Sequence, residues 1–146
     1  MKTIIFVVML LGAFVPVYGQ DARLEKYISE FNFDSAKEMK IDSKTLVALL
    51  KEGKAQLVDI RFREEYEAWK VGPSINIPLD ELPERWSEID KTKLTVTVCP
   101  HSDRSNVAMV YLRSKGIKAK FVSDGLLGIA ENLRGESARE LMNAIK

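Results

Sequence analysis

One cysteine occupies a position in the sequence where nucleophilic chemistry is favoured. Cys99 is the single cysteine among 146 residues, and it directly follows the run Leu-Thr-Val-Thr-Val at 94–98. That β-branched run predicts a strand, and the polar residues after Cys99 predict a tight loop before a helix that begins at Ser105. In an open α/β sheet, ligands bind outside the carboxyl ends of the strands. The sequence therefore predicts that Cys99 lies at a ligand-binding edge.

A loop of this kind could activate the thiol. Successive backbone N–H groups between a strand and a helix can form an anion-binding nest, capped by the helix N-terminus. Such a nest stabilises the thiolate, which is the nucleophilic form of cysteine. We therefore expect Cys99 to be functional, although a lone cysteine is commonly inert core filler. This hypothesis requires that the thiol is not sealed in the hydrophobic interior.

The residues that follow Cys99 provide further candidates. Arg104 could bind an anionic donor through its guanidinium fork, or it could simply neutralise Asp103. His101 is the only histidine in the chain, and it could act as a neighbouring cation or project into solvent. For Ser105 we expect a helix N-cap rather than a catalytic hydroxyl.

A second strand-end segment precedes this loop in the sequence. Arg61 follows the predicted strand 56–60 and could line the same pocket, or it could form an ion pair with Glu64 or Glu65. Asp59 is expected to accept hydrogen bonds from loop amides. No metal site is predicted, because one histidine, one cysteine and scattered carboxylates lack the spacing of metal ligands.

The remaining pattern alternates strands with helices. Strands are predicted at 56–60, 75–77, 94–98 and 120–122, and helices at 43–52, 63–69, 80–89, 105–115 and 138–145. A loop is predicted around Gly125 and Gly128. Strands separated by helices indicate an α/β fold, in which a mostly parallel central sheet is covered by helices on both faces.

The N-terminal residues indicate export. Lys2, the apolar run 4–15, the helix breaker Pro16 and the small residue Gly19 are typical of a signal peptide at 1–19. Cleavage is expected before Gln20, which would give a periplasmic or secreted protein with no membrane attachment. The alternative is an uncleaved membrane anchor. Residues 20–38 predict one amphipathic helix or a partly mobile arm, and 39–146 form the domain.

The charge pattern does not favour a nucleic-acid partner. Lys and Arg number 22 against 21 Asp and Glu, which gives a net charge of +1, and no polybasic block is present. A small molecule or a protein is therefore the expected partner.

Four segments resemble the rhodanese superfamily. Its domains carry Cys-x-x-Gly-x-Arg-Ser between a strand and a helix, and this chain has Cys-Pro-His-Ser-Asp-Arg-Ser at 99–105. The other three similar segments are Leu-Val-Asp-Ile-Arg at 57–61 with Glu-Tyr at 65–66, Pro-Ser-Ile-Asn-Ile-Pro-Leu at 73–79, and Phe-Val-Ser-Asp-Gly at 121–125. The resemblance covers about residues 39–135.

This resemblance implies a rhodanese-like three-layer sandwich and a sulfurtransferase activity. Cys99 would attack the outer sulfur of thiosulfate, polysulfide or a protein persulfide, and the resulting persulfide would pass its sulfur to a thiophilic acceptor. The partners would be a small sulfur-containing anion and a protein acceptor, without a cofactor. The implied substrate-binding residues are Arg104, His101, Ser102, Asp103, Ser105 and Arg61.

Three residues depart from the family pattern and could weaken thiosulfate binding. Ser102 stands where the family has glycine, so a positive φ there would be strained. Pro100 removes one N–H from the predicted nest. Asp103 brings a negative charge close to the anion site.

Two alternatives remain open from the sequence. A non-catalytic binding or redox-sensing module would leave Cys99 as a simple thiol. A tyrosine phosphatase of related fold would need five residues between cysteine and arginine, whereas four separate Cys99 from Arg104.

Overall fold

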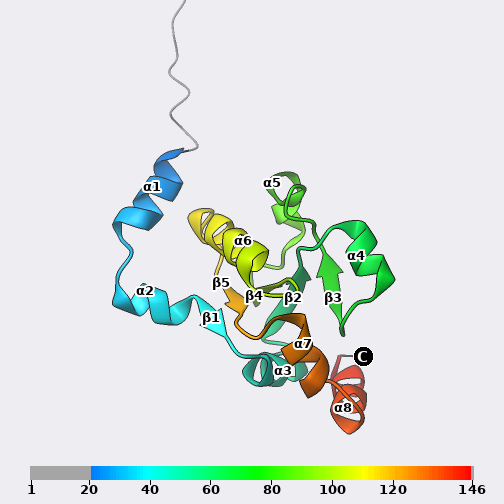
Figure 1. The fold of residues 1–146 in the computed structure, drawn as a ribbon. Coiled ribbons are helices and arrows are strands. Elements are labelled where there is room, and N and C mark those ends of the chain that lie inside the picture. Colours follow the sequence, from blue (N-terminus) through cyan, green and yellow to red (C-terminus); the bar gives the residue numbers. More distant parts are fainter. Residues whose placement is uncertain (1–20, 146) are drawn as a thin grey trace, which may run out of the picture.

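The computed structural model describes residues 21–145 and contains one five-stranded sheet (Figure 1). The strand order is β1-β5-β4-β2-β3, and every strand pair is parallel. The strands are β1 (Lys40–Ile41), β2 (Ala55–Asp59), β3 (Ser74–Asn76), β4 (Leu94–Val98) and β5 (Ala119–Val122). The predicted parallel sheet is confirmed, and β4 occupies its centre.

Eight α-helices and one short 3-10 helix accompany the strands within the described residues. They are α1 (Asp21–Ser29), α2 (Phe33–Glu38), α3 (Ser43–Lys51), α4 (Arg63–Ala68), α5 (Leu82–Arg85), η1 (Trp86–Glu88), α6 (Asp103–Ser114), α7 (Gly125–Asn132) and α8 (Glu136–Ala144). Asp42 is the N-cap residue of α3, since its side chain accepts a hydrogen bond from the Thr45 amide.

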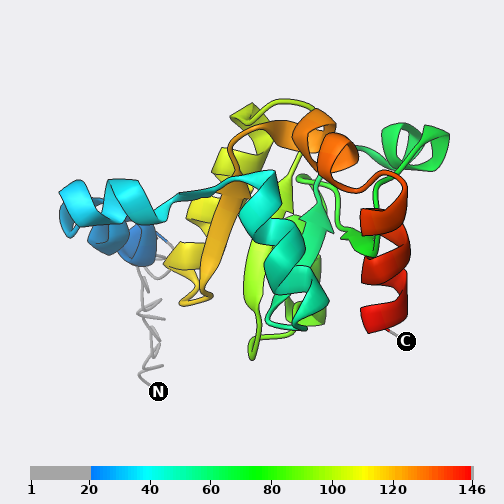
Figure 2. The same ribbon diagram turned by 90° about the horizontal axis from the view of Figure 1, so that it is seen from below.

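The sheet separates two hydrophobic clusters, which makes the fold a three-layer sandwich. On one face, Leu46 and Leu126 from α3 and α7 pack with Leu57 of β2. On the other face, Met109 of α6 packs with the next β2 residue, Val58. Neighbouring residues of a strand point to opposite faces of the sheet, so a strand covered on both faces is apolar at successive positions. Figure 2 shows the sheet between these helical layers.

The register of the two central strands determines what lies at the carboxyl edge. Asp59 at the end of β2 is the partner of Val98 at the end of β4. The Ile60 amide donates to the Val98 carbonyl at 3.1 Å. The segment after β2 and the segment after β4 therefore leave the sheet side by side.

Four details differ from the sequence-based expectations. The residues around Gly125 and Gly128 form helix α7 rather than a loop, because Leu126 and Ile129 bury one helical face. Helix α6 begins at Asp103, two residues before Ser105. Strand β1 was not predicted, since it has only two residues.

The fourth difference concerns the N-terminal extension. One helix was among the expectations, but Asn32 divides the segment into α1 and α2 by accepting a hydrogen bond from the Ser35 amide. Helix α1 contacts α6, and α1 and α2 lie to one side of the sandwich (Figures 1 and 2).

The predicted signal peptide at 1–19 lies outside the described residues. Between residues 21 and 145, no helix combines the length and the apolar character needed to cross a bilayer.

Candidate active site

Cys99 lies where the sequence predicted, directly after the central strand β4 and before helix α6. Its side chain has 0% exposed surface, and it belongs to the hydrophobic cluster on the α6 face. The thiol is therefore more enclosed than a nucleophile at an open sheet edge would be.

The sulfur atom nevertheless contacts polar side chains of its own loop. The distance from Cys99 Sγ to Asp103 Oδ1 is 3.6 Å, and that to Ser105 Oγ is 3.5 Å. Both oxygens can accept the thiol proton. Asp103 is exposed, so one side chain that contacts the sulfur also reaches solvent. The thiol is thus covered by the loop rather than sealed in hydrocarbon alone.

This arrangement corrects the expected nest of amide groups. Among residues 21–145, no backbone N–H donates a hydrogen bond to the Cys99 sulfur. The sulfur instead lies within hydrogen-bonding distance of two side-chain oxygens, to either of which its single S–H group can donate. The N-terminus of α6 remains the nearest source of positive potential for an anion formed at this position.

Two serines have roles different from those predicted. Ser102, not Ser105, is the N-cap residue of α6, and its φ of −145° avoids the strain that a positive φ would cause. Ser105 is completely buried, and its hydroxyl donates to the Ser102 carbonyl at 3.1 Å. The Ser105 hydroxyl thus links the Cys99 sulfur to the backbone at Ser102. The predicted N-cap role of Ser105 was wrong, because Ser102 occupies that position.

Asp103 brings a negative charge to the sulfur, as its position in the sequence suggested. The backbone N–H of Arg104 is the main cause that lowers the pKa of the Asp103 carboxyl, and the Cys99 thiol adds to this effect. The carboxylate is therefore ionised at neutral pH. No lysine, arginine or histidine among residues 21–145 lies within ion-pair distance of it.

The Arg104 guanidinium donates its hydrogen bonds to Glu65 rather than to the sulfur or to Asp103. The two bonds to Glu65 of α4 are 2.6 and 2.9 Å long, and the guanidinium lies over the Phe62 ring. These bonds hold the pKa of the Glu65 carboxyl below its usual range. The sequence had suggested a donor anion or Asp103 as the partner of Arg104, and in the structure Glu65 fills that role.

Arg61 is held by a different acidic residue than expected. It is 1% exposed, and its guanidinium binds the fully buried Asp59 rather than Glu64 or Glu65. It also donates to the carbonyls of Glu65 and Trp69 and lies over the Trp69 ring. Two residues at the end of β2 thus form a closed structural unit that anchors α4.

Gly125 allows α7 to approach the Cys99 loop. Its φ is +63°, and a Cβ atom at this position would lie 2.4 Å from the Pro100 carbonyl oxygen. The following Leu126 amide donates to the Cys99 carbonyl at 3.2 Å. Glycine is required here both for the backbone conformation and for the close contact.

A pocket of about 440 Å³ adjoins the loop. Its wall is mainly apolar and comes from α4, the Cys99 loop and α7; the lining residues are Arg61, Glu65, Ala68, Trp69, Pro100, His101, Leu126 and Leu127. His101 is exposed at the rim of this pocket rather than beside the sulfur. Of the predicted site residues, Arg61 and His101 thus line the pocket, while Ser102, Asp103 and Ser105 surround Cys99.

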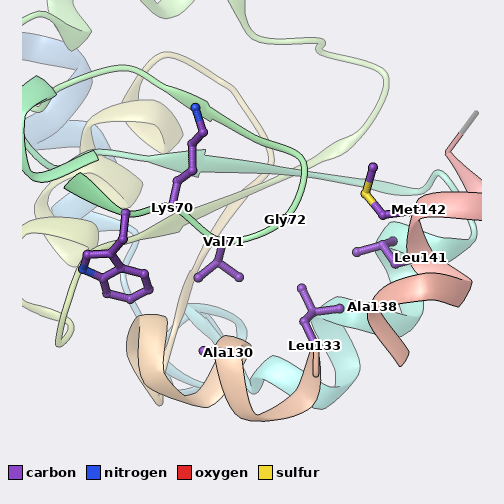
Figure 3. Close-up of a pocket in the computed structure, with 9 residues that line it drawn as sticks. Lys70, Val71, Gly72, Ala130, Leu133, Ala138, Leu141 and Met142 are labelled. Carbon is purple, nitrogen blue, oxygen red and sulfur yellow. The ribbon is translucent and has the colours of Figure 1, made fainter. Parts of the chain in front are cut away.

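A second apolar pocket of about 400 Å³ lies between α7, α8 and the loop before β3 (Figure 3). Ala130, Leu133 and Leu141 line it, and no residue of the Cys99 loop does. Trp69 lines both pockets. Within residues 21–145, no three His, Cys, Asp or Glu side chains are grouped to hold a metal ion.

Sequence reasoning missed the residues that other elements bring to the site. Glu65 was considered only as a partner of Arg61, and Leu126 and Leu127 were placed in a loop. Leu126 and Ile129 have helical spacing, but the glycines at 125 and 128 favour a loop.

A known protein family matches the part of the chain that carries the site. A model of the Rhodanese-like domain family matches residues 42–132. The Bacillus subtilis protein YqhL is 40% identical over 63 residues, which span 43% of this chain and 50% of YqhL. The chain therefore spans about half the length of this relative.

Two solved structures have a similar fold. A rhodanese-related protein from Thermoplasma volcanium has a TM-score of 0.59 and 28% identity, covering 64% of this chain and 92% of its own. The human single-domain sulfurtransferase TSTD1 has a TM-score of 0.56 and 27% identity, covering 63% of this chain and 95% of its own. With the family match across β2, β4 and the Cys99 loop, these similarities show that the chain belongs to the rhodanese-like domain family.

Proposed function

We propose that this protein is a sulfurtransferase that carries sulfane sulfur as a persulfide on Cys99. The observation that supports this most directly is the position of Cys99. It is the first residue after the central strand of a rhodanese-like domain, and it precedes the 12-residue helix α6. A helix N-terminus stabilises an anion in front of it, and both the thiolate and the persulfide are anions.

The reaction would proceed in two steps. The Cys99 thiol first loses its proton, for which the exposed Asp103 carboxylate provides a route to water. The thiolate attacks the outer sulfur of a donor such as thiosulfate, the donor S–S bond breaks, and sulfite leaves with the electron pair. An acceptor nucleophile then attacks the outer sulfur of the Cys99 persulfide and regenerates the thiolate.

The burial of Cys99 sets a condition on this reaction. A donor can reach the sulfur only if the side chains of the 100–104 loop shift, since the thiol has no exposed surface. The pocket beside Pro100 and His101 could hold the body of the donor during that shift. The buried Asp59–Arg61 pair and the contact between Gly125 and Pro100 would keep the surrounding elements in place.

The proposal is tested by intact-protein and peptide mass spectrometry after incubation with thiosulfate, polysulfide and an organic persulfide. We expect a gain of one sulfur atom on the peptide that contains Cys99. Addition of cyanide should remove this sulfur and release thiocyanate. The Cys99→Ser variant should remain folded and gain no sulfur. If no donor adds sulfur to Cys99 in the folded protein, the proposal is wrong.

A non-catalytic rhodanese-like module is the second candidate, and two observations favour it. Cys99 is completely buried, and Glu65 engages the Arg104 guanidinium that a small anion would need. This candidate predicts that every donor leaves the mass of the protein unchanged, even when Cys99 is shown to be reduced by alkylation after unfolding. The two candidates therefore give opposite results in the same experiment.

We also propose export through residues 1–19, because their order of charged, apolar and small residues is typical of a signal peptide. N-terminal sequencing of protein recovered from the extracytoplasmic fraction should begin at Gln20. Recovery with Met1 in the membrane fraction would favour the anchor instead.

A further inference from the structure

The charges around Cys99 are unusual for a site that accepts a small anion. Asp103 Oδ1 lies 3.6 Å from the sulfur. A donor whose outer sulfur approached Cys99 would bring its own negative charges close to this carboxylate. Two like charges at such a distance repel one another, even at an exposed position where solvent weakens the effect.

The cations near the site have acidic partners already. Arg104 is bound through two hydrogen bonds to Glu65, and Arg61 is bound to the buried Asp59. Both guanidinium groups thus donate to carboxylates of the protein, and neither donates a hydrogen bond to the sulfur. His101 lies at the pocket rim.

The pocket beside the loop suits an apolar group. Leu127 is 68% exposed and Trp69 is 46% exposed, and both line the pocket together with Leu126 and Pro100. Ligand pockets are typically lined by apolar and aromatic side chains. A hydrocarbon or aromatic group placed against Leu127 and Trp69 would remove their apolar surface from water, which favours binding.

We infer that the Cys99 site selects sulfur donors that carry an apolar organic group and at most one negative charge, over the inorganic dianion thiosulfate. In this assignment Asp103 is a specificity-determining residue that disfavours dianions, and Leu127 contributes the surface for the organic group. The inference rests on the proposed sulfurtransferase function, and it identifies the class of substrate.

A matched pair of donors isolates these two features. Benzenethiosulfonate is thiosulfate in which a phenyl ring replaces one charged oxygen, so it has one negative charge fewer and an apolar body. With either donor, the Cys99 thiolate attacks the outer sulfur and the donor S–S bond breaks. The electron pair leaves with benzenesulfinate in one case and with sulfite in the other. Both reactions give the same Cys99 persulfide.

The experiment measures the second-order rate of persulfide formation on Cys99 by rapid-quench mass spectrometry. In the native protein we expect benzenethiosulfonate to react at least about tenfold faster than thiosulfate, after each rate is divided by the rate with a free thiol of low molecular weight. That correction removes the intrinsic reactivity of each donor.

Two variants should change this preference in different ways. Asp103→Asn should raise the thiosulfate rate by about three- to tenfold and change the benzenethiosulfonate rate less, because the dianion gains more from removal of a like charge. Leu127→Ala should lower the benzenethiosulfonate rate by about three- to fivefold and the thiosulfate rate by less, because the inorganic donor has no hydrocarbon group to contact the leucine.

Matched controls lie on the N-terminal extension. Asp34→Asn removes the same charge from α2, and Ile28→Ala removes exposed apolar surface from α1. Neither should alter the ratio of the two rates. Circular dichroism and thermal unfolding verify that each variant is folded.

The outcomes separate this inference from the proposed function. If both donors load Cys99 but thiosulfate is equal or faster after correction, or if Asp103→Asn leaves the ratio unchanged, the inference is overturned and the function stands. If neither donor loads Cys99 in any folded variant, the function fails, and the inference fails with it.

Discussion

The two central strands end side by side at the same sheet edge, yet the segments that follow them differ in nearly every physical respect. After β2, Asp59 and Arg61 are both buried, and the guanidinium donates to one carboxylate and two backbone carbonyls. After β4, the Cys99 thiol meets an exposed carboxylate that has no ion-pair partner among residues 21–145.

This difference shows why a position at the end of a strand is not enough to identify a reactive group. The Asp59–Arg61 pair uses its polar atoms internally, and the resulting unit holds α4 through contacts to Glu65 and Trp69. The segment that starts at Cys99 instead leaves the Asp103 carboxylate beside the sulfur with no ion-pair partner among residues 21–145. Groups that satisfy each other stabilise the fold, whereas groups that do not are available for ligands.

The largest expected effect on stability comes from disrupting the buried Asp59–Arg61 pair. Arg61→Met leaves the Asp59 carboxylate buried without its cation, which should lower the free energy of unfolding by about 3–5 kcal/mol. Urea unfolding followed by tryptophan fluorescence measures this change. Arg63→Met, which removes an exposed ion pair with Glu81, is the control and should change stability little. A loss for Arg61→Met no larger than that of the control would contradict the structural role of the buried pair.

The next effect tests the close contact between α7 and the Cys99 loop. Gly125→Ala should cost about 2–3 kcal/mol of stability, because a Cβ would overlap the Pro100 carbonyl oxygen and the backbone has a positive φ. Persulfide formation on Cys99 should slow as well. Gly53→Ala is a matched control, since its φ is +67° but no atom lies within 4 Å of the added Cβ. It should cost only about 1 kcal/mol, from backbone strain alone.

A smaller effect sharpens the assignment of Ser105. Ser105→Ala removes the buried hydroxyl that contacts Cys99 Sγ and donates to the Ser102 carbonyl, which should cost about 1 kcal/mol. Ser114→Ala removes a hydroxyl with the same spacing to its acceptor, the Tyr111 carbonyl, at the far end of the same helix. Only the Ser105 variant should change the rate at which Cys99 is alkylated. Equal alkylation rates in the two variants would show that Ser105 does not influence the reactivity of Cys99.

The smallest effect is a pH dependence. The pKa of Glu65 is below its usual value of 4.5 in the folded protein, since Arg104 donates hydrogen bonds to it. The stabilisation is therefore complete above about pH 4.5 and is lost as the pH falls through the lower, folded-state pKa. Between pH 7 and pH 3, the Tm of the Glu65→Gln variant should decrease by fewer degrees than the Tm of the native protein. A parallel decline in both proteins would show that this ion pair contributes nothing.

Much of the architecture was predictable because strong local patterns agree with the tertiary fold. The run 94–98 is a strand by composition and by structure, and Asp42 caps α3 as its side-chain chemistry favours. Helix α7 was not predicted, because Gly125 and Gly128 have low helix propensity. A Cβ atom at Gly125 would overlap Pro100, and one at Gly128 would overlap Asp124. Helix propensity carries no information about these contacts.

From the sequence alone, one can determine the parallel α/β sandwich, the placement of Cys99 directly after a strand and the presence of Asp103 and Arg104 close behind it. These follow from local propensities and from the rule that parallel strands present their carboxyl ends together. Only the tertiary structure decided which charges neutralise each other. Glu65 forms an ion pair with Arg104, and Asp59 forms one with Arg61, whereas Asp103 contacts the sulfur. Ion pairs between separate elements depend on distances of a few ångströms in three dimensions, and spacing along the chain does not encode those distances.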